Sequence, residues 1–453
     1  MSKDGHKTYL IIGTGRSGIA AAKLLDGENA DILLYDDKED IDKEGIAAKT
    51  GNSDRITICA GSIPDGMEDK IDEVIVSPGV PLDSDTVLVW KNKNINIIGE
   101  IELAYRYEKG SVCAITGTNG KTTTTSLMGE VMKKKYEKVL VAGNIGYPYT
   151  DTVKESDDSS CSVLEISSFQ LETIGDFKPA VSAILNITPD HLNRHHTMEN
   201  YIDAKFNIAA NQTEDDVIVL NYEDEILRKR AEKIKPHVIY FSSRRELEEG
   251  VFLRGEKDII ARLDGKEILI CRTDELILPG IHNYENVMAA VAMAYAMGVS
   301  TDDIHDAVTS FKSVEHRIEY VCEKNDVIYY NDSKGTNPDA AIKGIQAMTR
   351  PTWLIGGGYD KGADFTDWVQ EFPGRVKKLV LIGETAAQIA DTCDKNGFHD
   401  YIKADSFEEA VRYCIDNAVP GDTVLLSPAC ASWDMFKSFE ERGNIFKDYV
   451  LGH

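Results

Sequence analysis

The sequence lacks the features of a membrane-inserted or exported protein. No apolar run approaches the roughly 20 residues that a spanning helix needs, and the opening stretch, MSKDGHKTYLIIG, contains no long apolar region. CxxC pairs are also missing. The eight cysteines are scattered, which fits reduced and mostly buried thiols better than a disulfide framework or a zinc site. We therefore expect a cytoplasmic protein with no membrane insertion.

Basic residues are scarce relative to acidic ones. The chain has 50 Lys and Arg against 76 Asp and Glu, a net charge of −26. A field of that sign repels nucleic acids and anionic membrane surfaces. The composition therefore argues against a nucleic-acid partner, and any phosphate site must be built locally.

Repeats of fixed period and low-complexity tracts are absent too, which excludes repeat architectures. Because 453 residues exceed what one core usually supports, we expect several domains. Short apolar runs alternate with helical patterns, which indicates parallel α/β units. The alternation restarts at SVCAITG and again at HRIEYV, and Gly-punctuated runs between 251 and 278 indicate hairpins. We predict a Rossmann-like domain at 1–101, a central P-loop ATPase-type α/β domain with a small β-hairpin region at 102–313, and a C-terminal Rossmann-like α/β domain at 314–453.

Two glycine-rich loops are present. In the first, IIGTGRSG, the glycines at 13, 15 and 18 form G-x-G-x-x-G, and Asp36 follows Gly18 by 18 residues. This is close to a dinucleotide fingerprint. A nicotinamide or flavin, another nucleotide, and a merely structural turn all remain open for this loop alone.

The second loop, GTNGKTT at 117–123, lies between an apolar strand pattern and a helical pattern. Backbone N–H groups of such a turn surround phosphates, Lys121 would neutralise the outer phosphates, and Thr122 would ligate Mg²⁺. A standard P-loop has glycine five residues before Gly120, where this chain has Ile115. The position of the loop between a strand and a helix nevertheless favours a phosphate site.

Three candidate residues follow in the same region. Glu165 ends an apolar strand and would ligate Mg²⁺, although a carboxylate there could simply cap a helix. His191 follows another strand; with His195 it is spaced for zinc, but the loop is not helical and no HExxH is present. Lys205 flanks the apolar stripe of a helix, and by itself it would be read as a solvated surface lysine.

In the last third, polar and basic side chains follow apolar strands. Arg317, Lys334 and Lys361 occupy such positions in an acidic chain, which favours local recognition of phosphate or carboxylate. Any one of them could instead be an ordinary surface charge.

Together these motifs resemble those of the Mur ligases, ATP-dependent amino-acid-adding enzymes of peptidoglycan synthesis. GTNGKTT, EISSFQLE, DHLNRH, HNYENVMAA and HRIE are similar to family-wide features. NDSKGTNPDA and LLSPACASWDMF resemble the member that adds D-glutamate to UDP-N-acetylmuramoyl-L-alanine. The resemblance spans essentially the whole chain and implies ATP, two Mg²⁺ ions and a carbamylated Lys205. We expect a monomer.

The resemblance also implies roles for individual residues. The residues implied in catalysis are Lys121, His191, Lys205, Arg317, Asp332 and Lys334. Those implied at the nucleotide are Gly117, Thr118, Asn119, Gly120, Lys121, Thr122, Thr123, Asn283, Asn286, Arg317 and Asp332. Metal would be held by Thr122, Glu165, His191 and Lys205. The substrates would contact Arg16, Ser17, Asp36, Asp37, Lys38 and Asn144 on the UDP-substrate side, and Thr336, Lys361, Ser432 and Phe439 on the glutamate side.

Three other functions compete with this interpretation. A nicotinamide-dependent oxidoreductase would use the first loop, and a P-loop regulator would use the second without ligation. A folylpolyglutamate-type ligase is the nearest rival within the family, and NDSKGTNPDA argues against it. In the ligase interpretation, γ-phosphoryl transfer to the substrate carboxylate forms an acyl phosphate, which the glutamate amine then attacks.

Overall fold

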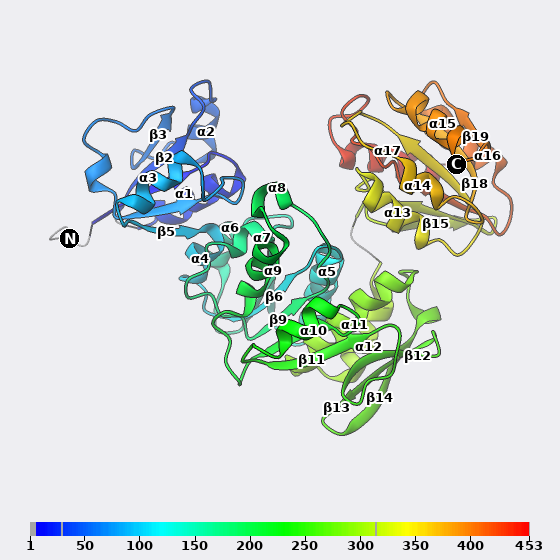
Figure 1. Cartoon of the computed structure of the whole chain (residues 1–453), viewed down its shortest axis with the longest axis horizontal. Helices are drawn as coiled ribbons and strands as arrows, with labels where there is room; N and C mark the ends of the chain where they lie inside the picture. The colour runs from blue at the N-terminus through cyan, green and yellow to red at the C-terminus, as the bar shows by residue number, and fades with distance from the viewer. Residues whose placement is uncertain (1–5, 29, 313–314, 453) are drawn as a thin grey trace. The chain divides into compact units, whose positions relative to one another are not determined.

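The computed structural model describes residues 6–28, 30–312 and 315–452 (Figure 1). Its described strands form three sheets, of five, nine and six strands. By mutual contacts the chain divides into two compact units. One runs up to Phe252 and also holds 260–270 and 288–304, and the other holds 253–259, 271–287 and the chain from His305 onward. No described helix combines the length and apolar character needed to cross a bilayer.

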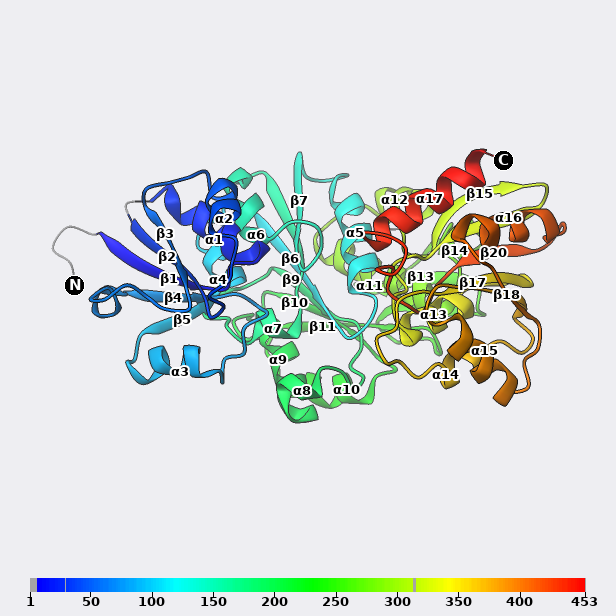
Figure 2. The ribbon, with the colours of Figure 1, turned by 90° about the horizontal axis from the view of Figure 1, so that it is seen from above.

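The first sheet is entirely parallel, with the order β3-β2-β1-β4-β5. Its strands are β1 (Lys7–Ile12), β2 (Ala30–Asp36), β3 (Ile56–Ala60), β4 (Glu73–Val76) and β5 (Asn96–Gly99). The accompanying helices are α1 (Arg16–Asp26), α2 (Lys43–Lys49), α3 (Asp85–Asn92) and α4 (Glu100–Tyr105). Figure 2 shows the five strands side by side. β1 is buried on both faces, which explains its unbroken apolar run.

The central sheet has the order β14-β13-β12-β11-β10-β9-β6-β8-β7. Its strands are β6 (Ser111–Thr116), β7 (Lys138–Gly143), β8 (Ser160–Glu165), β9 (Val181–Ile184), β10 (Val217–Asn221), β11 (His237–Ser242), β12 (Gly250–Arg254), β13 (Asp258–Leu263) and β14 (Lys266–Arg272). From β7 to β12 along this order, the paired strands are parallel. The last three strands are joined by connections of only three and two residues, which antiparallel hairpins allow. The expected hairpin region is confirmed.

The helices of the central segment range in length from four residues to 16 residues. They are α5 (Lys121–Met132), α6 (Tyr149–Thr152), α7 (Ser168–Leu171), α8 (Leu192–His195), α9 (Met198–Phe206), α10 (Glu225–Ala231), α11 (Ile281–Ala296) and α12 (Thr301–Ser310). Of these, α5 packs against β6, β7 and β8. The helix that begins at Lys121 therefore covers the strands whose ends carry the candidate residues.

The third sheet has the order β15-β16-β20-β17-β18-β19. Its strands are β15 (Glu319–Lys324), β16 (Val327–Asn331), β17 (Thr352–Gly357), β18 (Val376–Ile382), β19 (Tyr401–Lys403) and β20 (Thr423–Leu426). Only the β15–β16 pairing is antiparallel in this part of the structure. The helices are α13 (Pro338–Gln346), α14 (Thr366–Gln370), α15 (Ala386–Lys395), α16 (Phe407–Asn417) and α17 (Phe439–Gly452).

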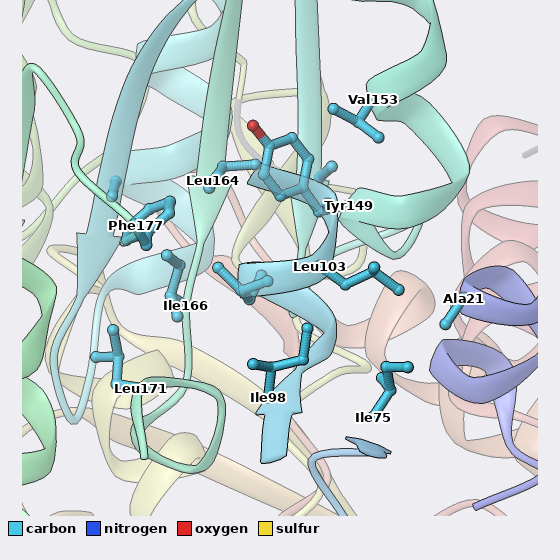
Figure 3. Packing of buried hydrophobic residues seen from close by; sticks show 14 of the residues in the cluster. Ala21, Ile75, Ile98, Leu103, Tyr149, Val153, Leu164, Ile166, Leu171 and Phe177 are labelled. Carbon is cyan, nitrogen blue, oxygen red and sulfur yellow. The ribbon is translucent and has the colours of Figure 1, made fainter. Parts of the chain in front are cut away.

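One hydrophobic cluster includes side chains from both the first sheet and the central sheet. Ile75 and Ile98 come from the first, and Leu164 comes from the second, with Leu103 of α4 among them (Figure 3). Residue 101, the expected first boundary, lies inside α4 and this cluster. The second expected boundary, between 313 and 314, lies outside the described residues.

Candidate active site

The turn after β6 contains two glycines in a backbone conformation that other residues rarely adopt. Gly117 and Gly120 have φ of 152° and 85°, a region that favours glycine. A Cβ on Gly117 would lie 3.1 Å from the Cβ of Leu185, so the turn is also closely packed. Thr118 and Asn119 donate their backbone N–H groups to Asn186, beyond β9, which fixes the turn to the neighbouring strand. α5 then starts at Lys121 and directs its N-terminus toward the turn.

Two lysines converge on one carbonyl of this turn. The Lys121 ammonium donates to the carbonyl oxygens of Gly117 and Thr118, both at 2.9 Å. Lys205, from α9, donates to the same Gly117 oxygen at 2.8 Å. Thr122 and Thr123, next along α5, are buried. The structure therefore brings Lys205 to the turn from a position 88 residues away in the chain.

The side chain of Lys205 is buried, with 2% of the residue exposed. Its Nζ lies 4.6 Å from the ring centroid of Tyr201. Burial, and then the nearby charge of Lys121, hold the pKa of Lys205 well below its usual range, while Asp190 acts weakly in the opposite direction. The surface-lysine alternative is wrong, because tertiary packing covers a residue that merely flanks the apolar stripe of its helix.

Glu165 lies at the carboxyl end of β8, next to β6 in the sheet, with Ile115 and Glu165 in register. One carboxylate oxygen accepts a 2.7 Å bond from the Asn144 amide. The other, Oε2, is buried and has no hydrogen-bond partner in the described part of the chain. An unsatisfied carboxylate oxygen is costly in a protein interior. Its position beside the phosphate-type turn fits a Mg²⁺ ion, a cation that prefers oxygen ligands.

The two histidines of the DHLNRH stretch have different environments. His191 is half exposed, has φ of 53°, and its ring lies 4.9 Å from that of Phe169. His195 is buried between Ser168, at 3.0 Å, and Glu172, at 3.2 Å. His195 therefore serves packing, and no group of three or more His, Cys, Asp or Glu side chains that could hold a metal ion occurs among the described residues.

Tyr201 is a site residue that the sequence reasoning missed. Its hydroxyl lies 3.0 Å from the Thr118 hydroxyl of the turn, and its ring lies beside the Lys205 ammonium. Tyr201 precedes Lys205 by four residues on α9, and residues at that spacing share a helix face. This spacing was the signal that could have identified it.

The first glycine loop is stabilised by an aspartate of its own sheet. Asp36 accepts bonds from the Thr14 hydroxyl, at 2.6 Å, and from the Thr14 backbone N–H. Burial acts to raise the pKa of Asp36, but these bonds and that from Lys38 outweigh it and lower the pKa. Asp37 accepts from the hydroxyls of Tyr35 and Thr86. The carboxylate of Asp36 thus binds the loop itself.

The other residues expected to contact the UDP substrate are more accessible to solvent. Arg16 is exposed and donates to the carbonyl of Gly146, two residues beyond Asn144. Ser17 is half-buried at the start of α1, and Lys38 is exposed. The structure thereby places Arg16 beside the loop that carries Asn144.

The two candidate asparagines of the HNYEN stretch lie in the first turns of α11. Both Asn283 and Asn286 are buried. The Asn283 amide donates to the carbonyl of Pro279 at 2.7 Å, and it also accepts a 3.5 Å bond from Asn286. The side chains therefore belong to a preformed turn rather than to open surface.

Asp332 lies just after β16 and is buried. It accepts from the Ser427 hydroxyl at 2.6 Å and from the backbone N–H of Ile318 at 3.2 Å. Burial raises the pKa of Asp332 to about 7, against the lowering effects of the Ser427 bond and the Arg317 charge. Arg317 is half-buried just before β15.

The remaining candidates gather around the ends of β16, β17 and β20. Lys334 lies 5.9 Å from the ring centroid of Phe439, the first residue of α17. Thr336 is half-buried, Ser432 is buried, and Lys361 is exposed on the loop after β17. Each of these residues follows a parallel strand at its carboxyl end, where ligands bind in such sheets.

Arg442 of α17 is a second residue that the sequence reasoning missed. It is 0% exposed and donates to the hydroxyl and carbonyl of Ser333 and to the carbonyl of Cys430. Burial lowers its pKa to about 10. This guanidinium therefore ties the loop after β16 to the loop after β20, and no sequence pattern signals that a charged residue of α17 is internal.

Known families match the chain along most of its length. Residues 7–99 match the model described as Mur ligase MurD-like, N-terminal domain; residues 115–294 match the Mur ligase middle domain; and 316–430 match the Mur ligase glutamate ligase domain. A protein of Lachnoclostridium phytofermentans named UDP-N-acetylmuramoylalanine--D-glutamate ligase is 54% identical, over 98% of each chain. A protein of Clostridioides difficile with the same name is 48% identical, also over 98% of each chain.

The chain belongs to the Mur ligase family. Solved Mur ligases share its fold. UDP-N-acetylmuramate-alanine ligase of Thermotoga maritima has a TM-score of 0.60 at 18% identity, covering 98% of this chain and 99% of that one. MurF of Acinetobacter baumannii has a TM-score of 0.63 at 18% identity, covering 97% and 93%. The expected three-domain α/β fold and ATP-dependent ligase are confirmed, and a nicotinamide-dependent oxidoreductase is excluded.

Proposed function

We propose that this Mur ligase joins D-glutamate to UDP-N-acetylmuramoyl-L-alanine, with conversion of ATP to ADP and phosphate, in peptidoglycan precursor synthesis in the bacterial cytoplasm. Relatives that are 45–54% identical over 98% of this chain carry the name of that ligase. The structural observation that carries the proposal is the convergence of Lys121 and Lys205 on the Gly117 carbonyl, beside the strand that ends at Glu165.

The second glycine loop would hold the triphosphate. In this proposal Gly117 to Thr123 supply backbone N–H groups, and the Lys121 ammonium exchanges its carbonyl acceptors for the outer phosphates. Thr122, Glu165 and His191 would hold Mg²⁺, and a second ion would use Lys205. Mg²⁺ supplies charge neutralisation during phosphoryl transfer. Asn144, already bonded to Glu165, would orient the acceptor carboxylate.

The reaction order follows from the weak electrophilicity of a carboxylate. Its oxygen attacks the γ-phosphorus, the bond to the β-phosphate oxygen breaks, and an acyl phosphate and ADP result. The glutamate amine then attacks the acyl carbon, loses a proton, and phosphate leaves from the tetrahedral intermediate. In this proposal Lys121 would stabilise the charge that spreads during the first step, so its loss is the most informative substitution.

Lys205 is proposed to act as a carbamate. Its neutral amine attacks CO₂ and releases a proton, so that an ammonium becomes an anion with two oxygens. For an ordinary lysine of pKa about 10.4, reaching the neutral amine at pH 7 costs about 4.6 kcal/mol. Burial beside Lys121 lowers the pKa of Lys205 and so reduces that cost. The resulting carbamate oxygens would ligate the second Mg²⁺ ion.

The remaining roles are proposals that follow the family motifs. Asn283, Asn286, Arg317, Asp332 and Lys334 would face the adenine nucleotide and its phosphates. The residues proposed to bind glutamate are Thr336, Lys361, Ser432 and Phe439. The residues proposed to bind the UDP substrate are Arg16, Ser17, Asp36, Asp37, Lys38 and Asn144. We propose that the enzyme works as a monomer made of domains 1–101, 102–313 and 314–453.

The test measures phosphate release from ATP with UDP-N-acetylmuramoyl-L-alanine and one amino acid at a time. We expect turnover with D-glutamate, and we expect Lys121→Ala to lower kcat at least about a hundredfold, because a charge-stabilising donor is lost. Lys133→Ala is the matched control, since Lys133 caps the far end of α5 and is exposed. Turnover with another amino acid but not with D-glutamate would refute the proposal, and so would full activity of the Lys121 variant.

A further inference from the structure

Trp433 is unusual among the tryptophans of this chain. The sequence has four, and Trp90, Trp353 and Trp368 are 3%, 7% and 0% exposed. Trp433 is 63% exposed, although it directly follows the buried Ser432. Tyr359, 37% exposed, packs against Trp433, so two aromatic rings lie together at the surface beside candidate substrate residues, an arrangement typical of binding surfaces.

The indole belongs to a small cluster that we call the aromatic platform, made of Tyr359, Lys361 and Trp433. The ring centroids of Tyr359 and Trp433 are 5.6 Å apart and tilted by 55°. The Lys361 Nζ lies 4.9 Å from the centroid of the Trp433 ring. Both distances are within the range of favourable aromatic and cation–π contacts.

Backbone pairing holds the two halves of the platform together. Tyr359 lies on the loop after β17, and its N–H donates to the carbonyl of Ala431 at 3.0 Å. The two residues form an antiparallel bridge, and Ala431 lies two residues before Trp433. Gly358, with φ of 148°, lets the chain turn into this pairing, and a Cβ there would lie 2.3 Å from the Ala431 oxygen. The platform is therefore built by two fixed loops.

Lys361 has no carboxylate within ion-pairing distance in the described part of the chain, so its cation is free for a ligand. The loop lies at the carboxyl ends of parallel strands, where ligands bind. A lysine side chain is flexible, and ordering it on binding costs conformational entropy. The indole face restricts the ammonium before the ligand arrives and leaves its charge intact.

We propose that Trp433, supported by Tyr359, is a positioning residue that holds the Lys361 ammonium in place for a carboxylate of the amino-acid substrate. The inference rests on the proposed function in taking D-glutamate as that substrate. Trp433 acts through Lys361 rather than by itself neutralising the substrate. The aromatic face, not the indole N–H, is the group that matters.

The first test compares Trp433→Leu with Trp433→Phe. We expect Trp433→Leu to raise the KM for D-glutamate about three- to fivefold, the size of an exposed cation–π contact. The KM values for ATP and the UDP substrate should stay within twofold, and so should kcat. Trp433→Phe, which keeps an aromatic face, should recover most of the affinity. Val419→Ala, at a 50% exposed residue of the same sheet unit, serves as the control.

A double-mutant cycle separates positioning from a direct contact. If Trp433 acts through Lys361, then Trp433→Leu should have no further effect on the KM for D-glutamate in a Lys361→Met background. Additive losses would show that Trp433 contacts the substrate on its own and would overturn the positioning role. An unchanged KM in Trp433→Leu alone would overturn the proposal entirely.

Fluorescence provides a readout independent of turnover. Because the other three tryptophans are buried, acrylamide quenching of the wild type should report mainly on Trp433. In the wild type, we expect quenching to decrease when D-glutamate is added together with the UDP substrate and a non-hydrolysable ATP analogue. In Trp433→Phe, the same addition should leave quenching unchanged. If wild type turns over D-glutamate but quenching does not respond, the inference fails while the proposed function stands. If no D-glutamate turnover occurs, the proposed function fails first.

Discussion

Replacing Lys205 by methionine should abolish ligation while leaving the apo protein as stable as before, or more so. Lys205 as a residue is 2% exposed, and in the described part of the chain its ammonium has one hydrogen bond, to the Gly117 carbonyl, and no carboxylate in contact. Methionine has a similar length and no charge to desolvate. The expected phenotype is a folded enzyme with kcat reduced at least about a hundredfold, since the proposed carbamate ligand of the second Mg²⁺ ion is lost.

The size of the stability change follows from opposing contributions. Losing the hydrogen bond costs about 0.5–1.5 kcal/mol. The desolvation relieved cannot exceed about 4.6 kcal/mol at pH 7, because the lysine can lose its proton instead. The free energy of unfolding of the variant should therefore differ from that of the wild type by between roughly −1.5 and +4 kcal/mol, where a positive value means that the variant is more stable. The structure favours the positive part of this range, because burial and Lys121 both lower the pKa of Lys205.

The sign can be checked with pH. A lysine whose folded-state pKa is lowered destabilises the fold at every pH below its unfolded pKa of about 10.4. Above the folded-state pKa, the advantage of the variant should shrink by about 1.4 kcal/mol per pH unit and disappear near pH 10.4. Denaturant unfolding of both proteins from pH 7 to 9.5, in CO₂-depleted buffer with a chelator, measures this trend.

Two outcomes would refute this reasoning. A Lys205→Met variant that is several kcal/mol less stable at pH 7 would make Lys205 a structural residue. Full ligase activity would remove it from the site. In Lys205→Ala, which leaves space, small carboxylates such as formate should restore part of the activity if a carbamate acts as the ligand. Lys133→Ala again serves as the exposed-lysine control.

Further predictions concern two buried carboxyl groups. Glu165→Gln should abolish the rise in thermal midpoint that Mg²⁺ produces in the wild type, because Oε2, which has no hydrogen-bond partner among the described residues, is the oxygen proposed to bind the ion; an equal rise in both proteins would contradict this. Burial raises the pKa of Glu100 from 4.5 to about 6. The free energy of unfolding therefore decreases as pH rises from 4.5 to 6, and the whole loss is present above pH 6. Glu100→Gln should therefore be more stable than wild type by up to about 2 kcal/mol at pH 7.5 and by almost nothing at pH 4.5; a gap that does not change with pH in thermal unfolding would oppose this reasoning.

Local patterns in the sequence were sufficient to predict many of the strands and helices and the glycine-rich turn at 117–120. The apolar run SVCAIT becomes β6, and the glycines at 117 and 120 adopt the positive φ values that a phosphate-type turn requires. The punctuated runs up to residue 272 become neighbouring strands, whereas LILPG at 276–280 forms no strand. These features depend on side-chain volume, chirality and periodicity within a few residues, all of which the sequence displays directly.

Tertiary structure alone decided which of those elements meet. The central sheet places β6 between β9 and β8, not in chain order, and so brings Glu165 to the edge where the turn lies. Packing of α9 then buries Lys205 against Gly117, and packing of α17 buries Arg442. A charge becomes a buried, perturbed group only when remote segments exclude water from it. That exclusion depends on the order of the strands and the helices above them, which a linear pattern does not encode.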